Sequence, residues 1–408
     1  MPAKKKSFLA TLPVELVHRI FDHLKTETIL FSIRYVCKRF YSITNTYNGF
    51  DLDFRYMSRS DLPFIARIID PKNVISLTLS DEIQTPGQIR SFLNHFHIER
   101  FIRLRSLNLV KVECKELDTF QKHISKCRLT TLSIAPNVYY KDGPTALISS
   151  IISNNDLRKF EYTGFCNIFN KIQLPIQCGL EHLTISHSNW DSVYSIIFHL
   201  PYLQTLVVKN VIWNQFNSIT FTYPDIPQSS HLTSLSLNFN YDMPINDVES
   251  VLSFLPMLMH LRLISERPLD DLQLFNGFRW ENFIQTKLPL LNRFEFWFTC
   301  LVPTDSNCTT VESLIASFQT SFWLEIKQWI IKCDYEYKKY HSKFHLYSIP
   351  IVRDNFDYYE QETTILHSAL NTTDNDATII VNARQLSLNL SQMMTNSISH
   401  LVSDILYF

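Results

Sequence analysis

A short apolar pattern recurs along most of this chain. It consists of an apolar residue, two residues of any type, a second apolar residue, one residue of any type and a third apolar residue. The triplets begin at Val74, Leu104, Leu129, Leu157, Leu180, Leu203, Leu232, Leu258 and Leu291. Because most successive triplets start 23–30 residues apart, the pattern indicates an internal structural repeat.

The spacing within each triplet predicts a strand. The last two apolar residues are two positions apart, so they point to the same face of a strand, and the first residue anchors the turn that leads into it. Amphipathic stretches such as 146–153, 193–199 and 248–255 lie between the triplets and are typical of helices. Strands that alternate with helices predict parallel strands joined by helical crossovers.

This repeat resembles the leucine-rich repeat, whose strands stack into a curved solenoid. The resemblance implies an irregular leucine-rich-repeat solenoid over residues 73–300, within an α/β fold. The chain departs from the family at the ninth repeat position, where Asn or Cys is preferred and only Asn137 and Asn240 match. A compact α/β domain with a doubly wound sheet is the alternative fold.

The segment 11–50 has a different pattern, which predicts a three-helix module. Pro13 suits the first turn of a helix, where its missing N–H costs nothing. An apolar stripe at helical spacing follows, made of Leu12, Leu16, Ile20, Phe21 and Leu24. Two more short helices are expected over 28–33 and 35–44. A module this short buries little surface by itself. Its apolar stripe therefore needs a partner protein or the following domain to cover it.

The residues of this module resemble the F-box in order and spacing. The matching positions are Leu12, Pro13, Glu15, Ile20, Phe21, Leu24, Val36, Cys37, Lys38, Arg39 and Phe40. Phe40 departs from the family, which usually has Trp there. The resemblance implies that the module binds a Skp-family adaptor, and through it cullin and RING subunits. The residues assigned to adaptor binding are Leu12, Pro13, Glu15, Leu16, Ile20, Phe21, Leu24, Val36, Cys37, Lys38 and Phe40. An ordinary capping helical bundle is the alternative.

A solenoid would place the residues between the core leucines on its concave face. These residues are small and hydroxylic in the early repeats and become charged, histidine-rich and aromatic later. Because Trp and Arg are enriched at binding hot spots, we predict that a target protein docks on the later repeats. The predicted target-binding residues are Lys159, Glu161, His182, Lys209, His260, Arg262, Arg293, Glu295 and Trp297. A merely solvated sheet face is the alternative for each of them.

The remaining segments complete the predicted domain organisation. The insertion 265–289 carries Phe275, Phe278 and Trp280 around Gly277, which suggests a loop that packs as a cap or touches the target. The flanking segments are assigned as a flexible tail (1–10), a connecting segment (51–72), a C-terminal cap with a helix at 311–321 and a strand pair (301–352), an acidic loop (353–380), and a terminal strand and helix (381–408).

Composition and glycine spacing exclude several function classes. The net charge of −1 argues against a nucleic-acid-binding surface, and no apolar run is long enough to span a membrane. The eight cysteines, without a C-x-x-C pair, suggest reduced thiols in the cytosol or nucleus. No two of the six glycines lie closer than fifteen residues, which excludes the glycine-rich nucleotide motifs and the nucleophile elbow. His341 and His345 lack a third ligand, so neither metal nor cofactor is expected.

Two functions remain after these exclusions. The first is the non-catalytic substrate-recognition subunit of a cullin-type ubiquitin ligase, which binds the adaptor through the helical module and a target protein through the repeats. The second is a repeat-based interaction scaffold that is not coupled to ubiquitination and whose helical start is only a cap. The sequence does not identify the target.

Overall fold

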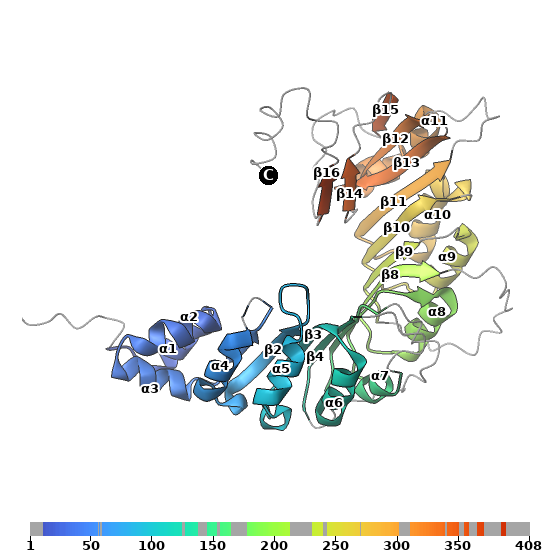
Figure 1. Ribbon diagram of the computed structural model, residues 1–408. Helices are drawn as coiled ribbons and strands as arrows, with labels where there is room; N and C mark the ends of the chain where they lie inside the picture. The colour runs from blue at the N-terminus through green and yellow to red at the C-terminus, as the bar shows by residue number, and fades with distance from the viewer. Residues whose placement is uncertain are drawn as a thin grey trace, which may run out of the picture. The chain divides into compact units, whose positions relative to one another are not determined.

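The computed structural model describes residues 11–55, 57, 59–124, 127–137, 145–152, 156–164, 178–212, 231–239, 243–269, 271–301, 311–338, 341–350, 355–358, 365–370 and 385–388. The chain divides into two compact units, residues 1–206 and 207–408. Each unit combines helices with strands (Figure 1), and each is described by itself.

Unit 1 begins with a helical module that contains α1 (Val14–Phe21), α2 (Thr26–Phe31), the 3₁₀ turn η2 (Ile33–Tyr35) and α3 (Lys38–Thr46). Pro13 directly precedes α1, and its carbonyl accepts the N–H of Val17 at 3.2 Å. The interior of the module is apolar, with Phe21, Leu30 and Ile43 all buried. The three expected helices are confirmed, with boundaries that shift by up to three residues.

The inner side of the module shares its core with the first strand, β1 (Phe50–Asp53). The ring of Tyr47 meets the rings of Phe21 and Phe50 edge-on, at centroid distances of 5.4 and 5.0 Å. Its hydroxyl donates to Asp22 at 2.9 Å, and burial together with this carboxylate raises the pKa of Tyr47. The N–H of Asp51 in β1 donates to Thr26 Oγ1 in α2 at 3.2 Å. The module and the strand are therefore one packed body.

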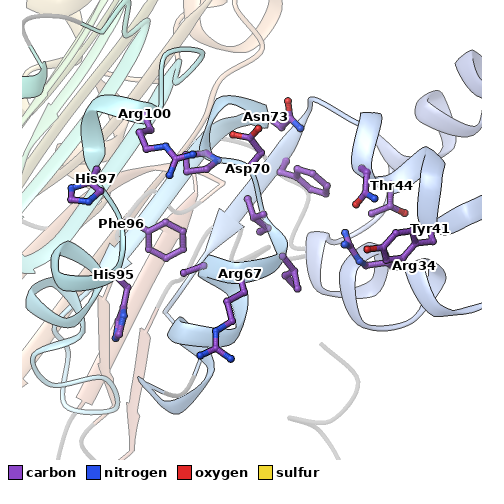
Figure 2. Close-up of a pocket in the computed structure, with 16 residues that line it drawn as sticks. Arg34, Tyr41, Thr44, Arg67, Asp70, Asn73, His95, Phe96, His97 and Arg100 are labelled. Atoms are coloured by element: carbon purple, nitrogen blue, oxygen red, sulfur yellow. The ribbon is translucent and has the colours of Figure 1, made fainter.

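A polar cleft of about 460 Å³ opens between this module and the segments that follow it (Figure 2). Residues of η2 and α3 line one side. The other side is formed by residues in and next to α4 (Leu62–Ile68), η4 (Pro71–Asn73), α5 (Gln88–His95) and η5 (Ile98–Arg100). The 3₁₀ turn η3 (Arg59–Asp61) directly precedes α4. The rings of Phe31 in α2 and Phe64 in α4 stack 6.0 Å apart, which fixes the helical module relative to α4.

The strands of unit 1 run parallel in sequence order from β1 to β6. After β1 they are β2 (Val74–Ser80), β3 (Ser106–Val112), β4 (Thr131–Pro136), β5 (Lys159–Tyr162) and β6 (His182–Ile185). The connections contain α6 (Cys114–Ile124) and α7 (Thr145–Ile152), and β7 (Ser188–Asn189) and α8 (Trp190–His199) follow β6. The middle residues of the triplets lie opposite one another in register, as Leu77, Leu107, Leu132, Phe160 and Leu183. All five are buried, so the strands predicted from the triplets are confirmed here.

A main-chain hydrogen bond repeats just ahead of successive strands. In unit 1 the N–H of Arg105 donates to the carbonyl of Ile75, and that of Thr130 donates to Arg105, each at 2.8 Å. The ladder continues through Arg158, Glu181 and Gln204 at 2.8–2.9 Å. Within unit 2 the equivalent bonds join Met259 to Thr233 and Asn292 to Met259, each at 2.8 Å. Equivalent positions therefore carry equivalent bonds, as a structural repeat requires.

Unit 2 contains parallel strands followed by antiparallel ones. The strands β8 (Thr205–Ile212), β9 (Ser234–Phe239), β10 (His260–Pro268) and β11 (Arg293–Leu301) lie in that order, and β9, β10 and β11 pair in parallel. Three antiparallel strands follow, in the order β13 (His341–Ile349), β12 (Ile330–Lys338) and β15 (Ile365–Leu370). A separate pair contains β14 (Asn355–Tyr358) and β16 (Gln385–Leu388). The helical elements are α9 (Ile245–Leu252), η7 (Leu272–Phe275), α10 (Gly277–Lys287), α11 (Val311–Ala316) and the π-helical η8 (Phe322–Ile326).

Several expectations for this part of the chain need correction. The segment 265–289 is not a loop, because η7 and α10 occupy most of it and bury Phe275 and Trp280. The acidic segment 353–380 contains the strands β14 and β15, because strand pairing with distant residues outweighs its local charge. The predicted strand pair is confirmed as β12 and β13, and the strand near residue 386 is confirmed as β16. The helix predicted over 399–407 lies outside the described residues.

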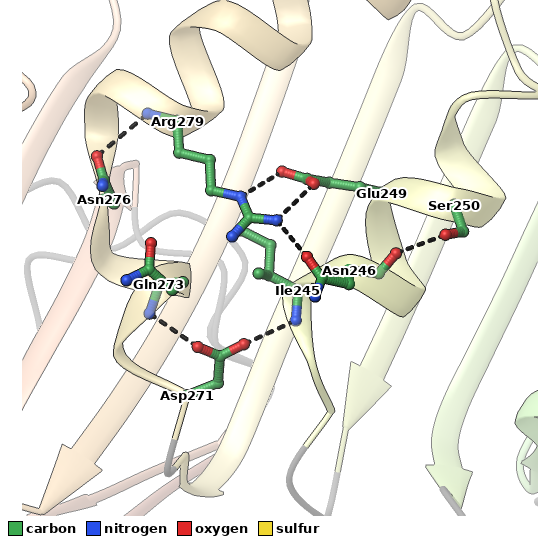
Figure 3. Close-up of polar contacts among 8 residues, drawn as sticks. All are labelled: Ile245, Asn246, Glu249, Ser250, Asp271, Gln273, Asn276 and Arg279. Carbon is green, nitrogen blue, oxygen red and sulfur yellow. Dashed lines mark hydrogen bonds and ion pairs between the residues drawn. The ribbon is translucent and has the colours of Figure 1, made fainter. Parts of the chain in front are cut away.

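A polar network joins α9 to α10 in unit 2 (Figure 3). Arg279 of α10 donates from Nε to Glu249 Oε1 at 2.8 Å and from Nη2 to Glu249 Oε2 at 2.7 Å. The same Nη2 donates to Asn246 Oδ1 at 2.6 Å. Beside this pair, the Asp271 carboxylate accepts the N–H groups of Ile245 and Gln273, each at 2.9 Å. Both helices are thus held at their N-terminal turns by charge-assisted bonds.

The Arg279–Glu249 pair gives a stability prediction. Glu249→Ala removes the bidentate carboxylate from a guanidinium that is only 26% exposed, so the free energy of unfolding should fall by about 1–3 kcal/mol. Urea denaturation followed by tryptophan fluorescence measures the change. Glu325→Ala, at an exposed position of unit 2, is the matched control and should change stability by less than about 0.5 kcal/mol. Equal effects of the two substitutions would contradict the role assigned to the pair.

Candidate functional site

The outer face of α1 presents apolar side chains to solvent. Leu16 and Ile20 are four residues apart, so they lie on one side of the helix, and they are 43% and 37% exposed. Val17 and Phe21 occupy the opposite side and are buried in the module. The single stripe expected from the sequence is therefore two faces, one that forms the core and one that is left uncovered.

A second exposed group lies at the start of α3. Val36 is 68% exposed, and Tyr35 and Cys37 on either side of it are also exposed. Arg39 of α3 donates from Nη2 to the carbonyl of Leu12, which holds the start of α1 against the start of α3. The two apolar groups therefore belong to connected parts of one module.

The other residues predicted for adaptor binding differ in exposure. Pro13, Glu15 and Lys38 are exposed, and Leu12, Leu24 and Phe40 are half-buried. Phe21 is 2% exposed and packs against Tyr47, so it belongs to the core and offers nothing to a partner. Sequence reasoning missed the exposed Val14 and Tyr35. The signal for Val14 is its place in the apolar sequence of α1, but spacing alone cannot tell which side of that helix faces inward.

The residues predicted for target binding fall on strands of both units. In unit 1, Lys159 of β5 is exposed, and Glu161 of β5 and His182 of β6 are half-buried. In unit 2, Lys209 and Arg293 are exposed, and His260 and Arg262 are half-buried. These positions retain surface for a partner, and their role in binding stays a prediction.

Glu295 is different, because it is buried in a charge cluster within unit 2. Its Oε2 lies 3.3 Å from His260 Nε2, and its Oε1 forms an ion pair with Arg293 Nη2. Burial opposes ionisation of this carboxyl, but the hydrogen bond from His260 and the positive charges of His260, Arg293 and Arg262 outweigh burial and lower the pKa of Glu295. Its carboxylate is already neutralised within the chain.

Trp297 is also occupied by its own unit. It is 7% exposed, and its ring stacks on Tyr347 with centroids 4.5 Å apart. Its indole N–H donates to Thr299 Oγ1 at 3.3 Å, and Tyr347 donates to Asp334 Oδ2 at 2.8 Å. Glu295 and Trp297 therefore stabilise the junction of β11 with its neighbours and have little surface left for docking.

Two cysteines of unit 2 are shielded from solvent. The buried thiols of Cys300 and Cys333 are poor nucleophiles, because burial raises the pKa of both, to about 12 for Cys300. Among the helices that the structure describes, none has the length and apolarity needed to cross a bilayer. The feature that stands out is the uncovered apolar face of the helical module.

Two substitutions should separate the core face of α1 from its outer face. Phe21→Ala opens a cavity beside Tyr47 and should lower the free energy of unfolding by about 3–5 kcal/mol. Leu16→Ala removes only solvent-exposed surface and should change it by less than about 1 kcal/mol. Hydrogen exchange of the amides in α1 and α3 measures both effects. A large loss of protection in Leu16→Ala would show that Leu16 is part of the core.

Acid titration tests the Glu295 cluster. Because folding lowers the pKa of Glu295, its ionised form stabilises unit 2 above the ordinary glutamate value of 4.5, and this contribution disappears as the pH falls through the lowered pKa. Glu295→Gln cannot lose a charge, so its melting temperature should fall less steeply between about pH 5 and pH 3 than that of the unaltered protein. Parallel pH profiles of the two proteins would contradict this assignment.

Comparison with known families agrees with the geometry of the module. Residues 9–47 match the F-box-like family, a stretch that ends at Tyr47, where the module joins β1. No curated protein matches the chain at a significant level. F-box domains generally bind Skp-type adaptors in ubiquitin ligase complexes. The chain therefore carries an F-box-like domain, which suggests an adaptor-binding role in such a complex.

Proposed function

We propose that this protein is the non-catalytic substrate-recognition subunit of a cullin-type ubiquitin ligase. In this proposal the F-box-like module binds a Skp-family adaptor, which brings the cullin and RING subunits, and the strand–helix repeats bind a target protein in the cytosol or nucleus. Ubiquitin transfer is catalysed by the other subunits, and this chain contributes proximity and orientation.

The exposed apolar face within the F-box-like residues carries the proposal. Leu16, Ile20 and Val36 all lie in the matched segment and are exposed, although the interior of the module is well packed. Uncovered apolar side chains that cluster on a small module are typical of a protein–protein interface. Burying them against an adaptor would supply the apolar contacts that the module cannot make by itself.

The repeats support the second half of the proposal. The buried triplets and the repeated main-chain hydrogen bond ahead of the strands are consistent with leucine-rich repeats within each unit. Repeats of this kind present an extended sheet face to a partner. Seven of the predicted target-binding residues keep exposed or half-buried side chains and are the first to test: Lys159, Glu161, His182, Lys209, His260, Arg262 and Arg293.

A second candidate is a repeat-based scaffold that is not coupled to ubiquitination. The observation in its favour is the inner side of the module, where Tyr47, Thr26 and Phe31 join it to β1 and α4 as a cap would. A cap, however, does not require an outer face with Leu16, Ile20 and Val36 exposed. The two candidates therefore differ in whether that outer face binds an adaptor.

An adaptor-binding assay with the full-length chain tests the proposal. Leu16→Glu and Val36→Glu place a charge on the proposed interface and should each weaken adaptor binding by at least about 10-fold, with no measurable binding in the double variant. Surface-immobilised adaptor and biolayer interferometry give the dissociation constants. Adaptor binding should also slow alkylation of the exposed Cys37, as measured by mass spectrometry.

The matched control is Ile102→Glu, which alters an apolar side chain that is 71% exposed in unit 1 and lies outside the helical module. It should bind the adaptor as the unaltered protein does. If the Leu16 and Val36 variants bind like this control, or if the unaltered protein does not bind the adaptor, the scaffold function is the correct one.

A further inference from the structure

The polar cleft of unit 1 contains more positive charge than the described residues balance. Figure 2 shows Arg34 and Thr44 on one side of the cleft and Phe96, His97 and Arg100 on the other, with Arg67 and Asp70 between them. Three arginines and two histidines line it, against a single carboxylate. That carboxylate, Asp70, is already engaged, because its Oδ2 lies 3.1 Å from Lys72 Nζ and its Oδ1 accepts the Lys72 N–H.

Arg34 is the strongest sign that the cleft suits an anion. It is 7% exposed, and its guanidinium lies 4.4 Å from the centre of the Tyr41 ring. No carboxylate among the described residues forms an ion pair with it. A charge this deeply buried without a counter-ion is costly, and a ring face compensates only part of that cost. The guanidinium of Arg34 is therefore a candidate binding group for an anion.

Thr44 gives a second, independent sign. Its side chain lines the same cleft and is fully buried, and its Oγ1 makes no hydrogen bond within the described part of the chain. Buried polar atoms without a partner are rare, because each one loses its bonds to water and gains nothing. A hydroxyl beside an arginine is a common donor set for an anionic oxygen.

Arg67 and Arg100 supply further donors from different elements. Arg67 is the penultimate residue of α4 and Arg100 is the last residue of η5, and both side chains are exposed. Neither forms an ion pair with a described residue. Guanidinium groups from three separate segments suit a ligand with more than one anionic group, since each planar fork can hold two oxygens. A volume of about 460 Å³ is in the range of small-molecule sites.

We propose that this cleft binds a small phosphorylated molecule with more than one phosphate group. Arg34 holds one phosphate on the side of the helical module, together with the Thr44 hydroxyl, which a local shift must uncover because Thr44 is fully buried. The exposed side chains of Arg67 and Arg100, which point to different ends of the cleft in Figure 2, turn inward to hold the other phosphate. The ligand joins the F-box-like module to the segments α4–η5, so its binding stabilises unit 1 by mass action. The inference does not depend on the proposed ubiquitin-ligase role.

Pyrophosphate is the probe that tests the site, with isothermal titration calorimetry and the melting temperature of the full-length protein as readouts. The unaltered protein should bind pyrophosphate more tightly than inorganic phosphate, and its melting temperature should rise with pyrophosphate. Arg67→Gln and Arg100→Gln should each weaken binding by about 5–10-fold, within the range for a charge-assisted bidentate contact. Arg103→Gln, which removes an exposed arginine outside the cleft, is the matched control and should not weaken it.

Thr44→Val separates binding from folding. It removes a hydroxyl that has no partner within the described residues, so the melting temperature without ligand should stay the same or rise, whereas pyrophosphate affinity should fall. Loss of affinity in this variant with an intact fold supports a phosphate contact at Thr44.

Three results would overturn the proposal. The first is no pyrophosphate binding to the unaltered protein at millimolar concentration. The second is equal affinity in the Arg67, Arg100 and Arg103 variants, which would mean diffuse surface attraction. The third is tighter binding of a phosphoserine peptide than of pyrophosphate, with the same dependence on Arg67 and Arg100, which would assign the cleft to a phosphorylated protein segment.

Discussion

Main-chain pairing between neighbouring strands is the constraint on which both units depend. A parallel strand has no hairpin neighbour, so the chain must return over a helix or a long connection before it can pair again. That return works only if each repeat places the same two side chains inside, as Leu107 and Leu109 do in β3 and Leu261 and Leu263 do in β10. The hydrogen bonds ahead of the strands fix the register at which this happens.

The helical module depends on contacts outside itself, because its own core is too small to bury all of its apolar side chains. Its inner side is completed by β1 through Tyr47, and its outer side keeps Leu16, Ile20 and Val36 in water. The same module contributes Arg34 and Thr44 to the cleft behind it. One segment of under forty residues thus carries a structural face, an apolar face and a polar face.

The triplets made the strands predictable, because a buried parallel strand needs apolar residues at fixed positions and the chain repeats them. β1 was missed, although Phe50, Leu52 and Phe54 alternate, because four residues are too few to stand out. α10 was read as a loop, although Trp280, Phe283 and Ile284 have helical spacing and the side chain of Asn276 caps its N-terminus. Gly277 is the first residue of this helix, so it does not interrupt the helical spacing.

The candidate site was only partly predictable for a physical reason. The sequence shows that Leu16, Ile20 and Phe21 are apolar residues of one helix. Which of them faces water depends on what packs against α1. Likewise, Glu295 and Trp297 occupy sheet positions that periodicity makes outward-facing, and the stacking of Tyr347 and the charges of His260 and Arg293 enclose them. The cleft was not foreseen, since it is formed by residues from Arg34 to Arg100 that share no motif.

The hydrogen bond from the Asp51 N–H to Thr26 has a consequence for truncated forms of the protein. β1 is the first strand of the sheet in unit 1, and such a border exposes main-chain groups that can recruit a strand from another molecule. Helix α2 sits on that border and satisfies one of its donors. The helical module therefore also shields the sheet from self-association. A truncated protein that begins after Thr46 would expose the border of β1, and the cell would have to keep such a fragment from aggregating.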